Sequence, residues 1–219
     1  MKLAQEYKTQ GIYISLGLIA LFFPFLPPEF FLVLFLAVGS YLSIAKPGSH
    51  VFSLLARDPD IKAGKLTGLV YLFFTMAILL LISLLVGVNK FPLFIIAGAL
   101  AITTFGDGVG DIINIHERAK NPEQKNGKVY SAKSSMVFLI SGSLYAFIVG
   151  AWISDLTLPI PYGMIFFLAV IGAITGALLE SITVEEDNLI IPFGSAMTMW
   201  RGYSIHSAIM QIHGTLFRC

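Results

Sequence analysis

Charge is scarce in this sequence. Asp, Glu, Lys and Arg together make up 12% of the 219 residues, whereas hydrophobic residues make up 56%. The mean hydropathy is +0.82. This composition excludes an ordinary soluble domain, in which about a quarter of the residues are charged. We therefore expect the chain to be embedded in a membrane.

Cysteines and long polar stretches are also rare. The single cysteine, Cys219, excludes an internal disulfide. The longest polar stretch, residues 114–133, carries Asn-Pro and Asn-Gly turn signals, so it is predicted to be a loop and not a domain. The sequence thus predicts one transmembrane bundle domain over residues 1–200, followed by a short tail, residues 201–219, to which we assign no role.

Apolar runs fill most of the chain, and six of them reach the length of about 20 residues that a helix needs to cross a membrane. A seventh, residues 189–200, is shorter and contains Gly and Pro, which indicates a span that is tilted, re-entrant or completed by the tail. We expect an all-α polytopic transmembrane helix bundle with six or seven spans. Within the sixth run, Gly172 and Gly176 form a G-x-x-x-G pair that favours helix packing. The six long runs begin near Gly11, Glu29, Leu66, Phe91, Ser134 and Tyr162.

Basic residues alternate along the chain in a way that predicts its orientation. They gather before the first run, between the second and third, and between the fourth and fifth, whereas the opposite loops hold Lys90 and little else. Because positively charged loops stay in the cytoplasm, we expect an integral membrane protein with a cytoplasmic N-terminus. Segment 45–65, which mixes apolar and charged residues, is either a short helix in the membrane interface or a plain loop.

Two aspartates end the fourth apolar run. A charged side chain near the bilayer centre costs about 3 kcal/mol, so Asp107 and Asp111 indicate a functional site. At a spacing of four residues they lie on one face of a helix, where one Mg²⁺ can contact both. Gly106, Gly108 and Gly110 leave room for a phosphate or for another backbone. The alternative is that the glycines serve helix packing and the aspartates cap the helix.

A basic loop and a second acidic motif follow on the same predicted membrane face. Lys128, Lys133 and Ser134 offer positive charge and a hydroxyl near the start of the fifth run, which is typical of phosphate binding but also of cytoplasmic anchoring. Glu180 follows an apolar stretch and is expected to be partly desolvated, either as a base or as a group stabilised by metal. Asp187 follows it by seven residues. The active site is therefore expected on the cytoplasmic side.

Together these motifs resemble a known family. The patterns are Gly-Asp-Gly-x-Gly-Asp at 106–111, Gly-Lys and Lys-Ser at 127–134, and Glu-Ser with Asp-Asn-Leu-x-Ile-Pro at 180–192. From residue 6 to 192 the chain resembles the CTP-dependent polyprenol, phytol and diacylglycerol kinases, relatives of the phosphatidate cytidylyltransferases. The resemblance implies a membrane enzyme that uses Mg²⁺ and transfers the terminal phosphoryl group of CTP to a lipid hydroxyl. Its acceptor would be diacylglycerol or an isoprenoid alcohol of the polyprenol, dolichol or phytol type.

The resemblance also implies roles for individual residues. The expected partners are a nucleotide and a lipid alcohol, not a nucleic acid, and the oligomeric state stays open. The implied catalytic residues are Asp107, Glu180 and Asp187, and the implied metal ligands are Asp107 and Asp111. The implied nucleotide-binding residues are Gly108, Gly110, Lys128, Lys133, Ser134 and Asn188.

The chain departs from the family pattern at two places. Many members carry Arg-Lys and then His where this chain has Thr9, Gln10 and Tyr13, and Glu-Gly-Ser where it has residues 136–138, Met-Val-Phe. Three alternatives therefore stay open. They are a CDP-lipid synthase acting on the α-phosphorus of CTP, a transporter with its acids along an ion path, and a noncatalytic relative.

Overall fold

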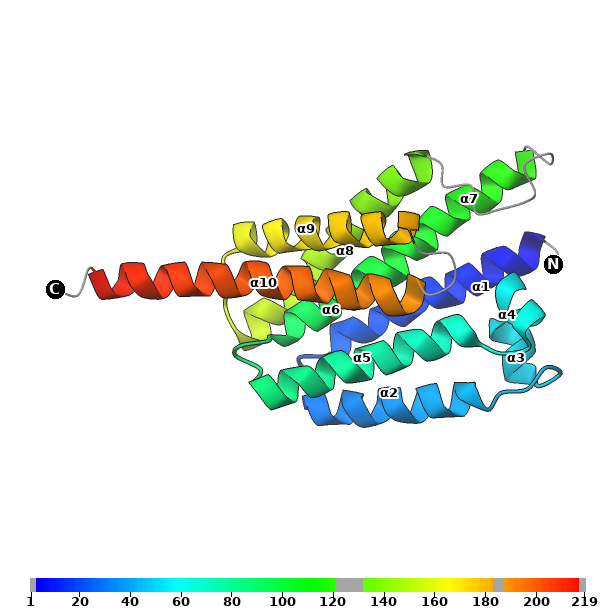
Figure 1. Ribbon diagram of the computed structural model, residues 1–219, viewed down its shortest axis with the longest axis horizontal. Helices are drawn as coiled ribbons and strands as arrows, with labels where there is room; N and C mark the ends of the chain where they lie inside the picture. Colours follow the sequence, from blue (N-terminus) through cyan, green and yellow to red (C-terminus); the bar gives the residue numbers. More distant parts are fainter. Residues whose placement is uncertain (1–2, 121–131, 183–186, 217–219) are drawn as a thin grey trace.

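The computed structural model describes residues 3–120, 132–182 and 187–216, and within these ranges all regular structure is helical. The elements form an elongated bundle in which most helices run along the long axis (Figure 1). The prediction of an all-α bundle is confirmed for this part of the chain.

The chain enters the bundle as a broken helix. Helix α1 (Leu3–Leu16) continues into a 3₁₀ segment, η1 (Gly17–Phe22). Prolines then interrupt the chain, and α2 (Pro28–Ser43) starts with Pro28 in its first turn, where the missing N–H is not needed. Segment 45–65 forms two short helices, α3 (His50–Leu55) and α4 (Asp58–Ala63). The segment is therefore helical and not a plain loop, whereas its position in the membrane interface stays a prediction.

Four helical stretches are long and apolar enough to cross a membrane. They are α5 (Thr67–Val86), the stretch Leu93–Glu117, α8 (Ala132–Thr157) and α9 (Tyr162–Ile182). The second of these is composite, because α6 (Leu93–Ala101) passes through a π-helical segment, η2 (Ile102–Asp107), into α7 (Gly108–Lys120). It is also the central one, since 83% of its apolar window is buried against 33% for α9. The chain is thus an integral membrane protein by the length and composition of its helices.

The remaining apolar runs form shorter or interrupted helices. α2 is apolar but shorter than the four, and α10 (Asp187–Leu216) contains Pro192. The predicted count of six or seven spans is therefore not confirmed, and it stays a prediction. α10 also continues without a break across residue 200, so residues 201–216 of the predicted tail extend this helix away from the bundle (Figure 1).

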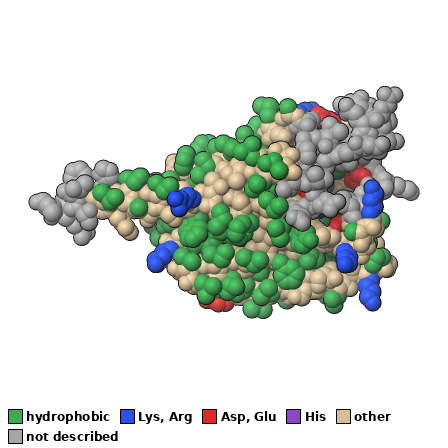
Figure 2. Space-filling model, viewed as in Figure 1, with side chains coloured by type: hydrophobic (Ala, Val, Ile, Leu, Met, Phe, Trp, Pro, Cys, Tyr) green, Lys and Arg blue, Asp and Glu red, His purple; other side chains and the backbone are tan. Residues whose placement is uncertain are grey.

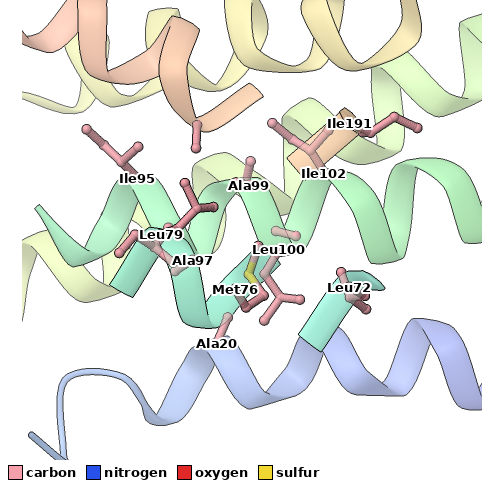
Figure 3. Close-up of a cluster of buried hydrophobic side chains, with 14 of the residues drawn as sticks. Ala20, Leu72, Met76, Leu79, Ile95, Ala97, Ala99, Leu100, Ile102 and Ile191 are labelled. Carbon is pink, nitrogen blue, oxygen red and sulfur yellow. The ribbon is translucent and has the colours of Figure 1, made fainter. Parts of the chain in front are cut away.

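The core forms around α6, in which small residues alternate with large buried ones, so that neighbouring helices approach it closely (Figure 3). Ala97, Ala99 and Ile102 are fully buried beside side chains of α5, η1 and α10. Gly172 and Gly176 of α9 face Ile102, at distances that leave no room for a larger side chain. The prediction that this glycine pair serves helix packing is confirmed.

The outer surface of the bundle is largely apolar. Along α8 the exposed large side chains recur every four residues, which places them on one outward stripe. Figure 2 shows hydrophobic side chains over the middle of one face and Lys and Arg side chains toward both ends. A lipid environment accounts for such a surface, because apolar side chains gain nothing from facing water. The stripe comprises Met136, Ile140, Leu144, Ile148, Trp152 and Leu156.

Candidate functional site

Polar and charged side chains, most of them buried, gather at the end of the bundle where α10 begins. Their helices meet there: α1, the α3–α4 segment, the start of α7 and the first turn of α10 lie at one end in Figure 1. We call this group the polar cluster. It consists of Gln10, Tyr13, Arg57, Asp107, Asp111, Asp187 and Asn188.

Asp107 and Asp111 join the cluster from the central helix. Asp107 is the last residue of the π segment and is 1% exposed, and Asp111 follows one turn later in α7. Residues 101–113 stay helical, so the two carboxylates remain one turn apart, as predicted. A π segment within an α-helix is rare and occurs often at functional sites. The break in regular geometry therefore coincides with the buried charge.

Gln10 of α1 contacts the second of these two carboxylates. Its Nε2 donates a hydrogen bond to Asp111 Oδ2 at 2.8 Å. Gln10 is 5% exposed, and its Oε1 has no hydrogen-bond partner among the residues that the structure describes. A buried amide oxygen normally accepts a hydrogen bond or contacts a cation. Gln10 thus offers an amide oxygen beside the Asp111 carboxylate.

Tyr13, one turn after Gln10, connects α1 to α10. Its hydroxyl donates a hydrogen bond to Asn188 Oδ1, across 175 positions of sequence. Asn188 in turn donates from its backbone N to Asp187 Oδ1 at 2.9 Å and from Nδ2 to the same oxygen at 3.2 Å. Asp187 lies in the first turn of α10, where the helix dipole stabilises a negative charge. The first two residues of α10, Asp187 and Asn188, are therefore fixed against α1.

Arg57, just before α4, is the cation of the cluster. The centre of its guanidinium lies 5.7 Å from the centre of the Tyr13 ring, and its Nε lies 3.7 Å from Asp60 Oδ2. Burial by itself lowers the pKa of Arg57. The negative charges of Asp187, Asp107 and Asp60, together with Tyr13, outweigh that effect and raise the pKa above its ordinary value. Arg57 therefore stays charged and neutralises part of the acidic group.

The space beside each glycine around Asp107 is occupied by side chains of neighbouring helices. A Cβ on Gly108 would lie 2.5 Å from Ile14 Cγ1, and one on Gly106 would lie 3.2 Å from the Phe138 ring. A Cβ on Gly110 would lie 3.3 Å from Ser134 Oγ. These glycines therefore bring α1 and α8 against the central helix, which supports the packing alternative. A role of Gly108 and Gly110 toward a nucleotide stays a prediction.

The basic loop falls partly within the described residues. Lys128 lies outside them. Lys133 is exposed in the first turn of α8, and Ser134 is buried and donates from Oγ to the carbonyl oxygen of Gly110 at 3.0 Å. Ser134 thus fixes the start of α8 beside the Asp107–Asp111 turn, while Lys133 is free to reach solvent.

Glu180 is buried, as its sequence position predicts. It is 2% exposed near the end of α9. Gly176, one turn earlier, faces Ile102, Phe138 and Ser195, so this face of α9 is turned toward the central helix and away from lipid. Glu180, Asp107 and Asp187 therefore all lie inside the bundle.

Among the described residues no group of three or more His, Cys, Asp or Glu side chains is gathered closely enough to hold a metal ion. Mg²⁺ commonly uses one or two protein carboxylates and completes its shell with water and substrate phosphates. Asp107, Asp111 and the amide oxygen of Gln10 are oxygen donors of that kind. Their chemistry fits Mg²⁺, although the geometry of a bound ion is not defined.

Sequence reasoning missed three members of the cluster. Gln10 and Tyr13 stand where the resembled family carries other residues, and Arg57 counted only as a cytoplasmic charge. Arg57 precedes the pattern Asp-Pro-Asp, which indicates a helix start; its backbone N donates to Asp60 Oδ2 at 3.0 Å. That signal locates the cap but not the burial of the guanidinium.

Comparison of the chain with protein-family models, with curated proteins and with solved structures finds no match. The polar cluster and the motifs in the sequence are therefore the features from which a function can be inferred.

Proposed function

We propose that this protein is a membrane lipid kinase that transfers the terminal phosphoryl group of CTP to the hydroxyl of an isoprenoid alcohol or diacylglycerol. One observation carries the proposal: three buried carboxylates and two buried amides gather with a partly buried aspartate and a partly buried arginine at one end of an apolar bundle. So much buried polarity is costly, and it is typical of a functional site in a membrane protein. The four carboxylates are Asp60, Asp107, Asp111 and Asp187.

The residues of the cluster suit phosphoryl transfer, which depends mainly on positioning and on neutralising charge. Asp107 and Asp111, with the Gln10 amide oxygen, are the proposed ligands of Mg²⁺. Bound there, the ion would neutralise the phosphate oxygens. Lys133 is exposed at the adjacent start of α8, where it can contact the triphosphate from the solvent side. The nucleotide would thus lie where α1, α7, α8 and α10 meet.

The proposed transfer needs a proton acceptor. As the acceptor oxygen bonds to the γ-phosphorus, the bond from that phosphorus to the bridging oxygen breaks, and CDP leaves. The hydroxyl proton must pass to a base in the same step. Glu180 is our candidate, because it is a buried carboxylate on the α9 face that is turned toward the central helix. Asp187 accepts a hydrogen bond from the backbone N of Asn188, which fixes a further carboxylate at the site.

The proposal includes a topology. We propose six or seven spans with the N-terminus and the polar cluster on the cytoplasmic side. The reason is the positive charge in the segments that border the cluster, which include Lys8, Lys62, Lys65 and Lys133. Lys133→Cys in a Cys219→Ser background provides the test. An impermeant thiol reagent should label this cysteine in inside-out vesicles and not in right-side-out ones. Labelling only from the outer side would reverse the orientation.

The activity is tested with purified protein, Mg²⁺, and CTP labelled in either the γ or the α phosphate. The acceptors are a panel of isoprenoid alcohols and diacylglycerol. A kinase moves only the γ label to lipid. Transfer of the α label with release of pyrophosphate would instead identify a CDP-lipid synthase, and no transfer with any acceptor would contradict the enzyme proposal. ATP in place of CTP tests the donor.

A further inference from the structure

Several side-chain and backbone contacts hold Arg57 in place at this end of the bundle. Its guanidinium lies over the Tyr13 ring and next to Asp60, and its Nη2 lies against Gly68 in the first turn of α5. Asn188 Nδ2 approaches the same glycine, so Arg57 and Asn188 are neighbours. A Cβ at position 68 would collide with both side chains. Gly68 therefore makes the space that the guanidinium fills.

The Arg57 guanidinium lies where a positive charge would neutralise the carboxylates of Asp107 and Asp187. Asn188, which approaches the same glycine as Arg57, donates from Nδ2 to Asp187 Oδ1 at 3.2 Å, so the guanidinium lies close to this carboxylate. The negative charges of Asp187 and Asp107 raise the pKa of Arg57 against the effect of burial. A buried carboxylate without a compensating charge is strongly destabilising. In the protein without ligands, Arg57 supplies that compensation.

A guanidinium is also well suited to polyphosphate. Its planar fork of donors binds phosphate oxygens in pairs, and it is less strongly hydrated than an ammonium group. Arg57 lines a small crevice with Thr9, Ile12 and Tyr13, whose volume of about 10 Å³ holds at most one water. A phosphate group can enter this crevice only if the Arg57 side chain moves.

We propose that Arg57 holds the place of a cation among Asp107 and Asp187 in the free protein and exchanges these carboxylates for phosphate oxygens when a metal–triphosphate binds. The inference deepens the proposed kinase function and rests on it for the identity of the ligand. Before binding, Arg57 excludes divalent ions from the acids. After binding, the incoming cation neutralises the carboxylates, and Arg57 neutralises the phosphates. Metal and triphosphate would therefore bind together and not singly.

Two substitutions at this position separate its charge from its shape. Arg57→Gln removes the charge that competes with a metal, so Mn²⁺ alone should bind about tenfold more tightly than to the wild type. The same change should weaken binding of Mg²⁺ with inorganic triphosphate about 10- to 100-fold, since a charge-assisted hydrogen bond is lost. Arg57→Lys keeps the charge and loses the fork. It should leave Mn²⁺ affinity within about twofold of the wild type and still weaken triphosphate binding.

The measurements use the full chain in detergent or nanodiscs, with Mn²⁺ affinity from electron paramagnetic resonance and triphosphate affinity from calorimetry. Gly68→Ala displaces the guanidinium without changing any charge and should weaken triphosphate binding as Arg57→Lys does. Gly163→Ala is its control, because nothing lies within 4 Å of a Cβ there. Circular dichroism checks that each variant is folded, and Arg57→Lys keeps the test valid if Arg57→Gln does not fold.

The pattern across variants decides the inference. A structural role alone would change the stability of the variants while leaving both affinities within about twofold of the wild type, and that result overturns the proposal. Mn²⁺ affinity that falls in Arg57→Gln overturns it as well. Neither measurement requires phosphoryl transfer. A protein that follows the predicted pattern but transfers no phosphoryl group would refute the kinase and leave the role of Arg57 standing.

Discussion

The two ends of the bundle use polar side chains in different ways. At the end where α10 begins, charged and amide side chains from distant segments bind one another inside the protein, as Gln10 does with Asp111 and Tyr13 with Asn188. At the other end, aromatic side chains bind loop or backbone oxygens near the surface. Trp200 Nε1 donates to Lys90 O at 2.8 Å, and Trp152 Nε1 donates to Leu21 O at 3.2 Å.

This difference separates two kinds of polarity in one membrane protein. Trp side chains at an interface anchor a bundle by satisfying backbone groups, and they need no ionised partner. Buried carboxylates give no such benefit, because their desolvation exceeds what packing returns. Substitutions at the first end should therefore affect ligand binding and activity, whereas those at the second end should affect stability alone.

The largest effect is expected for Asp107→Asn, which removes one buried charge and keeps the side-chain shape. If Asp107 neutralises the metal–triphosphate, transfer from CTP should fall at least about a hundredfold. Labelled CTP measures it. Asp155→Asn is the matched control, since Asp155 is exposed at the opposite end of α8 and only bonds to the Tyr162 hydroxyl, at 3.0 Å. Equal activity in the two variants would remove the distinction between the ends.

Gly108→Val tests whether close approach of α1 to the central helix forms the site. The new side chain would overlap Ile14, and such overpacking destabilises a fold by about 1–3 kcal/mol. Thermal unfolding in detergent measures the loss. Gly163→Ala, where space is open, should leave the free energy of unfolding within about 0.5 kcal/mol. If Gly108→Val unfolds like the wild type, the helices do not pack as described.

Tyr13→Phe leaves Asn188 without its hydroxyl partner. Because the pair is buried, we expect a loss of about 1–2 kcal/mol in the free energy of unfolding, together with slower CTP turnover. Tyr203→Phe is the counterpart at the other end, where the hydroxyl donates to Asn89 O at 3.3 Å. It should cost about 0.5 kcal/mol and leave turnover unchanged. Reversed effects on turnover would contradict the account.

The smallest effect is expected for Trp200→Phe, which removes the indole hydrogen bond to the Lys90 carbonyl and keeps an aromatic ring against Phe91. A neutral hydrogen bond near the surface contributes about 0.5–1 kcal/mol. Unfolding should shift by that amount, and turnover should not change. A loss of activity would mean that the two ends are coupled.

Much of the bundle is predictable from the sequence, because its longest helices follow its apolar runs. α5, α8 and α9 begin within two residues of the predicted starts at Leu66, Ser134 and Tyr162. The continuation of α10 into the tail is one of three alternatives for the seventh run, and the sequence does not select it because polar residues after Trp200 and an internal Pro192 both disfavour a continuous span. The π segment that ends at Asp107 also has no marker in local composition.

The residues of the site also differ in how well the sequence predicts their burial. The burial of Asp107 and Glu180 is predictable, because each borders an apolar run, whereas the burial of Asp187 is not predicted from its acidic surroundings. The burial of Gln10 and Arg57 is not, since both lie in polar segments whose positions depend on how α1 and α4 pack. A single sequence reports local environment well, whereas contacts across 101 positions, such as Gln10 to Asp111, depend on the whole bundle.

Calorimetric binding of CTP with Mg²⁺ to the purified protein tests the central claim most directly, with Asp107→Asn and Asp155→Asn measured alongside the wild type. The account predicts that the wild type and Asp155→Asn bind equally, and that Asp107→Asn binds at least about tenfold more weakly. Equal affinity in all three proteins, or no binding by the wild type, would contradict a nucleotide site in the polar cluster.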